Sequence, residues 1–339
     1  NNNFTYEPFY RNENSWFPLL ECINNPISHG PLAEIISFNI SNIKNVTFIL
    51  ALILILIFLK IYFLELDNAK KEYKYLIFFL SLSPPFNFLI DRLNIDLIIL
   101  LAIYFLFKNY YQFTSLKLFF LLIMSLYKLH PIFIIIGLCF YFAVNKDLKN
   151  TILHLSALIL FLIVFIPWYL GSSQDIPIFS NQGMTYGVLS DSIYLDKIIV
   201  SDFAQLNYLI TYSLLVFMIF VVSIYFYNKL NKDNSKTNSN IFIFVLITWY
   251  LGTSLYANND YRIAFLILAA NWIFSLNNTS YKFSFVFLML LNPLPIIKNN
   301  HLFAMDSYNY LDLNFYFFTS FTLAYLIKIF ITKLKVQRV

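Results

Sequence analysis

Tyr127-Lys128-Leu129-His130-Pro131 stands between two almost wholly apolar runs, Leu116–Leu126 and Ile132–Val144. A lysine inside such a run costs a few kcal/mol in hydrocarbon, so it needs a partner or a function. Pro131 lacks an amide hydrogen and disfavours helix at His130, which predicts a break or bend beside the lysine. At membrane depth, backbone groups freed by a break are tolerated only inside protein or beside a wet cavity. The stretch therefore predicts the floor of a polar site in a membrane protein.

Composition supports the membrane class for the whole chain. Of the 339 residues, 59% are hydrophobic and 12% are charged, and this charged fraction is roughly half that of a soluble domain. Repeated apolar runs between short polar loops predict an all-α, polytopic membrane protein with about eleven transmembrane helices, several of them short. The predicted spans are 46–64, 75–90, 95–107, 116–126, 132–144, 151–170, 206–227, 241–257, 263–276, 283–297 and 313–331.

The placement of charge predicts which ends of these spans face outward. With residues 1–45 as an extracytoplasmic loop region, most lysines fall at cytoplasmic ends, and the outer loop 171–205 carries four aspartates against one lysine. This follows the positive-inside rule. We expect a transmembrane domain at 46–339 in the plasma (inner) membrane, in contact with membrane lipids and not with nucleic acid. One more helix is expected upstream of residue 1.

Short spans predict a recessed outer face. A helix of about 14 residues rises about 21 Å, less than a hydrocarbon core of about 30 Å. The turns at Asp91 and Lys128 should therefore lie below the outer surface, at the bottom of a depression. An intramembrane cation needs an anion, and lipid phosphates supply one, so Lys128 predicts a phosphate site. Alternatively, Lys128 forms a structural ion pair with a residue such as Asp91. His130 either packs within the turn or donates a hydrogen bond to a phosphate or a sugar hydroxyl.

Three other outer segments carry candidate binding groups. The turn Asp91-Arg92-Leu93-Asn94-Ile95-Asp96 either caps the next helix or displays a carboxylate and a guanidinium in the depression. In the long outer loop, amides and hydroxyls that suit a polyol belong to Asn181, Gln182 and Tyr186. The block Asn258–Arg262 precedes an apolar run. Asp260 is therefore a candidate for capping the helix predicted there, and Arg262, if it faces the protein interior, needs a buried anion as its partner. Four histidines lie scattered without ligand spacing. No cofactor is assigned, and a divalent cation that bridges phosphate oxygens stays open.

These blocks together resemble a known family. Asp91–Leu97, Tyr127–Pro131, Ser180–Leu189 and Asn259–Arg262 are similar, in order, to motifs of the polyprenol-phosphate-mannose-dependent mannosyltransferases, glycosyltransferase family 87. His29-Gly30-Pro31-Leu32 resembles that family's approach to its first long helix. The chain departs from the pattern at Leu93, Gly183 and Leu268.

The resemblance implies a GT-C fold and an active site outside the cytoplasm. It implies transfer of mannose or a similar sugar from a polyprenyl-phosphate donor to a lipid or glycan acceptor. The donor phosphate would be bound by Lys128, Arg262 and Arg92. Sugar or acceptor would be bound by Asn94, His130, Asn181, Gln182, Tyr186 and Tyr261. The family's catalytic aspartate is expected upstream of residue 1, with Asp91 and Asp260 as candidates inside the chain.

Three other functions remain open from the sequence. A transporter or flippase of lipid-linked sugars would use the same cations in a cavity that opens alternately to both sides. A polymerase or ligase that joins lipid-linked glycans would also work at the outer face. A scaffold without catalysis is the remaining alternative, and a recessed cavity lined with cations argues against it.

Overall fold

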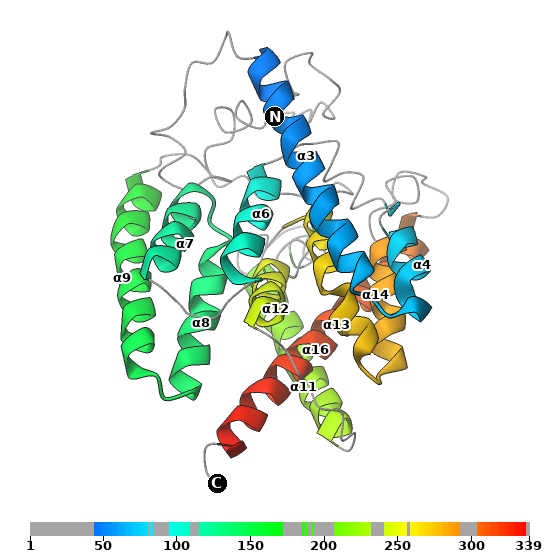
Figure 1. Cartoon of the computed structure of the whole chain (residues 1–339). Helices are drawn as coiled ribbons and strands as arrows, with labels where there is room; N and C mark the ends of the chain where they lie inside the picture. The colour runs from blue at the N-terminus through cyan, green and yellow to red at the C-terminus, as the bar shows by residue number, and fades with distance from the viewer. Residues whose placement is uncertain are drawn as a thin grey trace, which may run out of the picture.

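The structure, a computed structural model, describes residues 44–80, 82–83, 95–108, 115–171, 185–186, 188, 192, 207–231, 241–255, 258–291 and 304–336. The regular structure in these ranges is helical apart from one pair of two-residue strands, with short turns between helices (Figure 1). The elements are α3 (Lys44–Asp67), α4 (Lys71–Leu80), α6 (Ile95–Phe107), α7 (Ser115–Tyr127), α8 (Ile132–Val144), α9 (Leu148–Gly171), β1 (Thr185–Tyr186), α11 (Asn207–Asn231), α12 (Ile241–Leu255), β2 (Asn258–Asn259), the 3₁₀ helix η2 (Asp260–Ala269), α13 (Ala270–Ser275), α14 (Thr279–Leu291) and α16 (Ala304–Val336).

The helices follow the apolar runs of the sequence closely. Both α6 and α8 have the bounds expected from hydropathy, and α16 extends the predicted span 313–331 at both ends. Two expectations are wrong. The predicted span 75–90 is not one helix: α4 ends at Leu80 and a turn follows at residues 82–83, directly before Pro84 and Pro85, which disfavour helix. The predicted span 263–276 is not one α-helix. It is the last part of the ten-residue 3₁₀ helix η2, followed by the six-residue α13. A 3₁₀ run of that length is uncommon and often marks strain or a functional hinge.

Three described helices are long and apolar enough to cross a membrane, at Leu148–Trp168, Leu209–Leu230 and Asn314–Thr332. The first two lie in α9 and α11 and are only 17% buried, whereas the third lies in α16 and is 61% buried. The apolar side chains of α9 and α11 thus face outward, which suits hydrocarbon better than water. Of the other described helices, α3 has 24 residues and the rest are shorter, and the count of about eleven spans stays a prediction.

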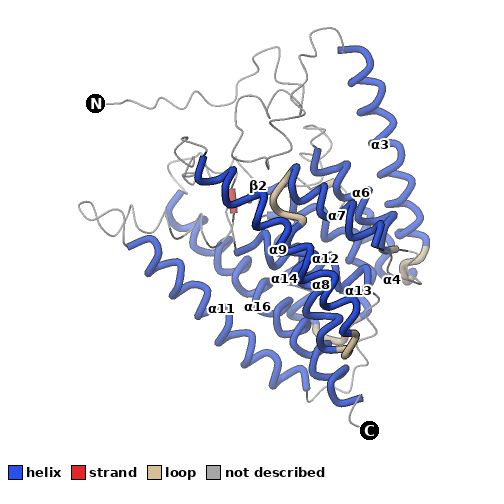
Figure 2. The backbone as a smooth tube through the Cα atoms, turned by 90° about the vertical axis from the view of Figure 1, so that its left-hand side faces the viewer, coloured by secondary structure: helices blue, strands red, loops and turns tan. Residues whose placement is uncertain are grey.

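The core gathers around α16, which packs against α8, α11, α12 and α14. In Figure 2, α11 runs along one side of the bundle next to α16. Two buried tyrosines reach α16 from neighbouring helices: Tyr250 pairs with Thr319 at 3.1 Å and Tyr281 with Thr322 at 3.0 Å between hydroxyl oxygens. Hydrogen bonds of this kind fix helix contacts where the surroundings offer no water.

Two glycines bring α8 and α12 close together. Gly137 of α8 lies against Thr248, and Gly252 of α12 lies against the ring of Phe133, so closely that a Cβ on either glycine would overlap its neighbour. Small residues allow such approach between apolar helices. The crossing matters because the polar turn before α8 and the aromatic side chains of α12 are thereby held side by side.

Candidate functional site

The predicted helix break at the lysine is present. The amide of Lys128 donates to the carbonyl of Met124 at 2.8 Å and completes the last turn of α7. The chain then turns through residues 128–131, and Pro131 occupies the cap position before α8 with φ −63°. A proline suits this place because its missing amide hydrogen would be unpaired in the first turn anyway. The side chain of Lys128 is buried, with 3% of its surface exposed.

The lysine turn lies well short of the end of α9. Helices α8 and α9 pack together and are joined by residues 145–147, but α8 has 13 residues and α9 has 24. At 1.5 Å per residue, α8 therefore ends about 16 Å short of the far end of α9. Figure 1 shows α8 beginning below the upper end of α9. The buried lysine is thus at depth within the bundle, as the short span predicts.

A stack of three rings connects this turn to η2. His130 lies against Trp249 of α12 with ring centroids 5.2 Å apart, and Trp249 Nε1 donates to His130 Nδ1 at 2.8 Å. The other side of Trp249 stacks on Phe265 of η2 at 4.6 Å. All three side chains are buried. Since η2 begins at Asp260, the stack ties the lysine turn to the helix whose first turn carries Arg262.

The strand pair connects the other two motif blocks. β1 and β2 are antiparallel, with Thr185 opposite Asn259 and Tyr186 opposite Asn258. The long outer loop and the 258–262 block, which are about 70 residues apart, are therefore neighbours through their backbones. The sequence placed both blocks on the outer face but did not predict their pairing.

The chain matches no family model, no curated protein and no solved structure. Several predicted site residues lie outside the described residues: Asp91, Arg92, Asn94, Asn181 and Gln182. For four more, the structure gives the backbone position alone: Tyr186, Asp260, Tyr261 and Arg262. Their side-chain roles stay predictions.

Two cavities are lined by described residues, and neither includes Lys128 among its lining. The larger, of about 550 Å³, is an open groove along α14 and α16 whose floor is formed by Ser284 and Asn314. Those two residues hydrogen-bond each other, with Ser284 Oγ donating to Asn314 Oδ1 at 2.7 Å. The smaller, of about 10 Å³, lies beside Trp249 and Phe265 and has room for about one water molecule. The depression above the lysine turn stays a prediction.

Sequence reasoning missed the aromatic link. With 20% aromatic residues, a tryptophan in the middle of an apolar run carries no distinguishing signal. Only the crossing of α8 and α12 places Trp249 between His130 and Phe265. His130 is, in the structure, a packed turn histidine whose Nδ1 is already hydrogen-bonded, and sugar binding by its ring stays a prediction.

Metal ligands do not gather in the described part of the chain. Within those ranges, no group of three or more His, Cys, Asp or Glu side chains could hold a metal ion. The polar residues of the candidate site are a cation, an imidazole and backbone groups. Such a set suits an anionic ligand better than a cationic one.

Proposed function

We propose that this chain is a membrane glycosyltransferase with a GT-C-like fold. It transfers mannose or a similar sugar from a polyprenyl-phosphate donor to a lipid or glycan acceptor, at the extracytoplasmic face of the plasma membrane. About eleven membrane spans would hold the site. The resemblance of four ordered sequence blocks motivates the proposal. One observation carries it furthest: the His130–Trp249–Phe265 stack joins the Lys128 turn to η2, and the β1–β2 pair joins η2 to the outer loop.

The chemistry follows from the groups that these blocks contribute. A carboxylate removes the proton of the acceptor hydroxyl, and the acceptor oxygen forms a bond to the anomeric carbon. The bond from that carbon to the phosphate oxygen breaks, configuration inverts, and polyprenyl phosphate leaves. Asp91, Asp260 or an upstream aspartate would be the base. Because the leaving group carries the growing charge, Lys128, Arg262 and Arg92 would stabilise the transition state.

The position of Lys128 within the bundle, well below the end of α9, favours a lipid-linked donor. A phosphate group stabilises a buried ammonium group such as that of Lys128. The phosphate of a membrane-anchored donor can meet the lysine from the bilayer side while its sugar points to the outer face. A free sugar nucleotide would have no comparable route for its polar base and ribose.

The test is sugar transfer by the purified protein in liposomes, with a panel of radiolabelled polyprenyl-phosphate sugars. Lys128→Met should lower transfer at least about a hundredfold, the usual scale for a group that stabilises charge in the transition state. The matched control is Lys328→Met, because Lys328 is also buried and lies outside the candidate site, where it donates to the carbonyl of Leu230 at 2.8 Å near the end of α11. Equal activity in the two variants would remove Lys128 from the mechanism. Movement of donor across the bilayer without transfer would instead identify the flippase.

A further inference from the structure

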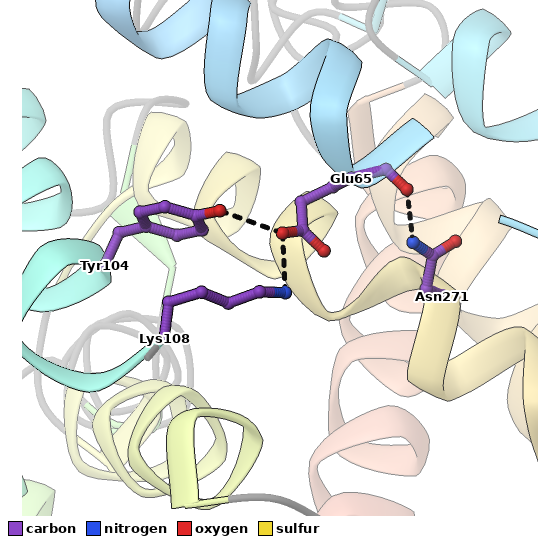
Figure 3. A network of polar contacts seen from close by, with 4 residues as sticks. All are labelled: Glu65, Tyr104, Lys108 and Asn271. Atoms are coloured by element: carbon purple, nitrogen blue, oxygen red, sulfur yellow. Dashed lines mark hydrogen bonds and ion pairs between the residues drawn. The ribbon is translucent and has the colours of Figure 1, made fainter. Parts of the chain in front are cut away.

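A second polar cluster lies where α3, α6 and α13 meet (Figure 3). Glu65 of α3 is only 7% exposed. Its Oε1 accepts a hydrogen bond from the hydroxyl of Tyr104 at 3.0 Å and forms an ion pair with Lys108 Nζ at 2.5 Å. Both partners come from the end of α6, one turn apart. The carboxylate thus fixes the end of α6 against α3 through two directional contacts.

The same residue also holds α13. Asn271 Nδ2 donates to the backbone carbonyl of Glu65 at 2.5 Å. The amide orientation is set by that carbonyl, which can only accept, and among the described residues Asn271 Oδ1 has no hydrogen-bond partner. The contact with Glu65 therefore fixes which way the Asn271 amide points.

Lys108 extends the cluster to α12. Its ammonium lies 5.5 Å from the ring centroid of Phe242 and 5.8 Å from that of Tyr104. The two rings meet edge to face at 5.4 Å. Four helices therefore meet at Glu65 and Lys108, and two of them lead to the ring stack of the candidate site: α12 carries Trp249, and α13 continues η2, which carries Phe265.

Stability alone is a weak reason for an ion pair whose carboxylate is buried, although the Lys108 side chain keeps 26% of its surface exposed. The loss of hydration of both charges often cancels their attraction, and apolar side chains of similar volume can replace such a pair without loss of stability. Apolar contacts, however, tolerate sliding of one helix along another. A charged contact of fixed length does not, and one residue of slip shifts a helix by about 1.5 Å. A misplacement of about 1 Å in a reacting group can cost about a hundredfold in rate.

We propose that Glu65 is a positioning residue for the transfer reaction. Its contacts with Lys108, Tyr104 and Asn271 hold α6, α12 and η2–α13 in the register at which the His130–Trp249–Phe265 stack joins the Lys128 turn to η2. Glu65 itself does not touch the substrate. This inference rests on the glycosyltransferase function proposed above.

The experiment measures donor KM, kcat and thermal unfolding for variants of the pair. Lys108→Met should raise donor KM about tenfold or more, and it should also lower the unfolding temperature because the buried Glu65 carboxylate loses its counter-ion. Lys108→Arg keeps the charge and the reach, so KM should stay within about threefold of the wild type. The double variant Glu65→Gln/Lys108→Met removes both charges together. It should raise KM as Lys108→Met does, but with an unfolding temperature close to that of the wild type, so it tests the inference even if Lys108→Met does not fold.

Asp67→Asn is the matched control. Asp67 lies two residues further along α3 and pairs with Lys74 at 3.6 Å, but its side chain is 82% exposed. Loss of that exposed pair should leave KM and kcat unchanged. A merely structural Glu65 would lower the active fraction and therefore kcat while KM stayed at the wild-type value, which would overturn the inference.

Lys128→Met, measured in parallel, distinguishes failure of the positioning role from failure of the proposed phosphate site. If it abolishes transfer while the Lys108 and Glu65 variants keep the wild-type KM, only the positioning role is wrong. If Lys128→Met transfers sugar at the wild-type rate, the phosphate site is wrong and the positioning role falls with it.

Discussion

Asp147 is the residue whose charge has the clearest structural consequence. It precedes α9, where its Oδ2 accepts a hydrogen bond from the side-chain amide of Asn150 at 2.6 Å and its Oδ1 accepts one from the backbone amide at 3.2 Å. These bonds, the side-chain bond first, lower the pKa of the Asp147 carboxyl below its usual value. A carboxylate with a lowered pKa stabilises the fold above its unfolded pKa of about 3.9 and loses that contribution as pH falls through the folded pKa.

We therefore expect Asp147→Ala to destabilise the protein by about 1 kcal/mol at pH 7, and by progressively less below about pH 4. Thermal unfolding of both proteins in detergent, from pH 7 to pH 3, measures the difference. Asp147→Asn keeps an acceptor without the charge, so its difference from Asp147→Ala should not depend on pH. A constant gap between wild type and Asp147→Ala down to pH 3 would contradict the assignment.

Single residues were predictable where they break a pattern. Lys128 and Pro131 interrupt an apolar run, and the structure places a buried lysine and a helix break there. Glu65 and Trp249 gave no such signal. Glu65 lies near the polar end of an apolar run, where a surface position is the ordinary expectation, and only the packing of α6 and α13 buries it. Sequence patterns report a side chain's own preferences, whereas these two roles come from residues distant in the chain.

At the scale of elements, the crossing of α8 and α12 depends on two glycines. Gly137→Leu or Gly252→Leu would force the helices apart, because the added atoms meet Thr248 or Phe133. Overpacking of this kind costs about 1–3 kcal/mol of stability, which thermal unfolding measures.

The control is Ala143→Leu on the exposed side of α8, which should change stability by less than about 0.5 kcal/mol. Phe133→Ala should recover part of the loss in Gly252→Leu and none in Gly137→Leu. Equal losses at all three positions would mean that the crossing is not tightly packed.

Helix bounds were predictable where hydropathy changes sharply, as at both ends of α8. They were not predictable where polar residues continue a helix. α16 begins at Ala304 and passes through Asp306 and Asn309 before its apolar part. The 3₁₀ geometry of η2 was also missed, because periods of 3.0 and 3.6 residues are not distinguishable over a segment of ten residues whose last seven are all apolar. An α-helix and a 3₁₀ helix can bury the same apolar residues. Tertiary contacts, such as that of Trp249 with Phe265, accompany the 3₁₀ geometry observed here.

At the scale of the whole molecule, the proposed function requires the lysine turn to lie on the extracytoplasmic side. α9 is long enough to cross a membrane, so its two ends would lie on opposite sides. The end near Lys146 and Lys149 carries the positive charge expected in the cytoplasm. Lys128 lies just before the first residue of α8, and this end of α8 points toward the Gly171 end of α9.

Alkaline phosphatase, which is active only outside the cytoplasm, should therefore be inactive when fused after Lys146 and active when fused after Gly171. Fusions of green fluorescent protein should give the reverse pattern. Active phosphatase after Lys146 would place Lys128 toward the cytoplasm, where a donor phosphate at the outer face could not reach it.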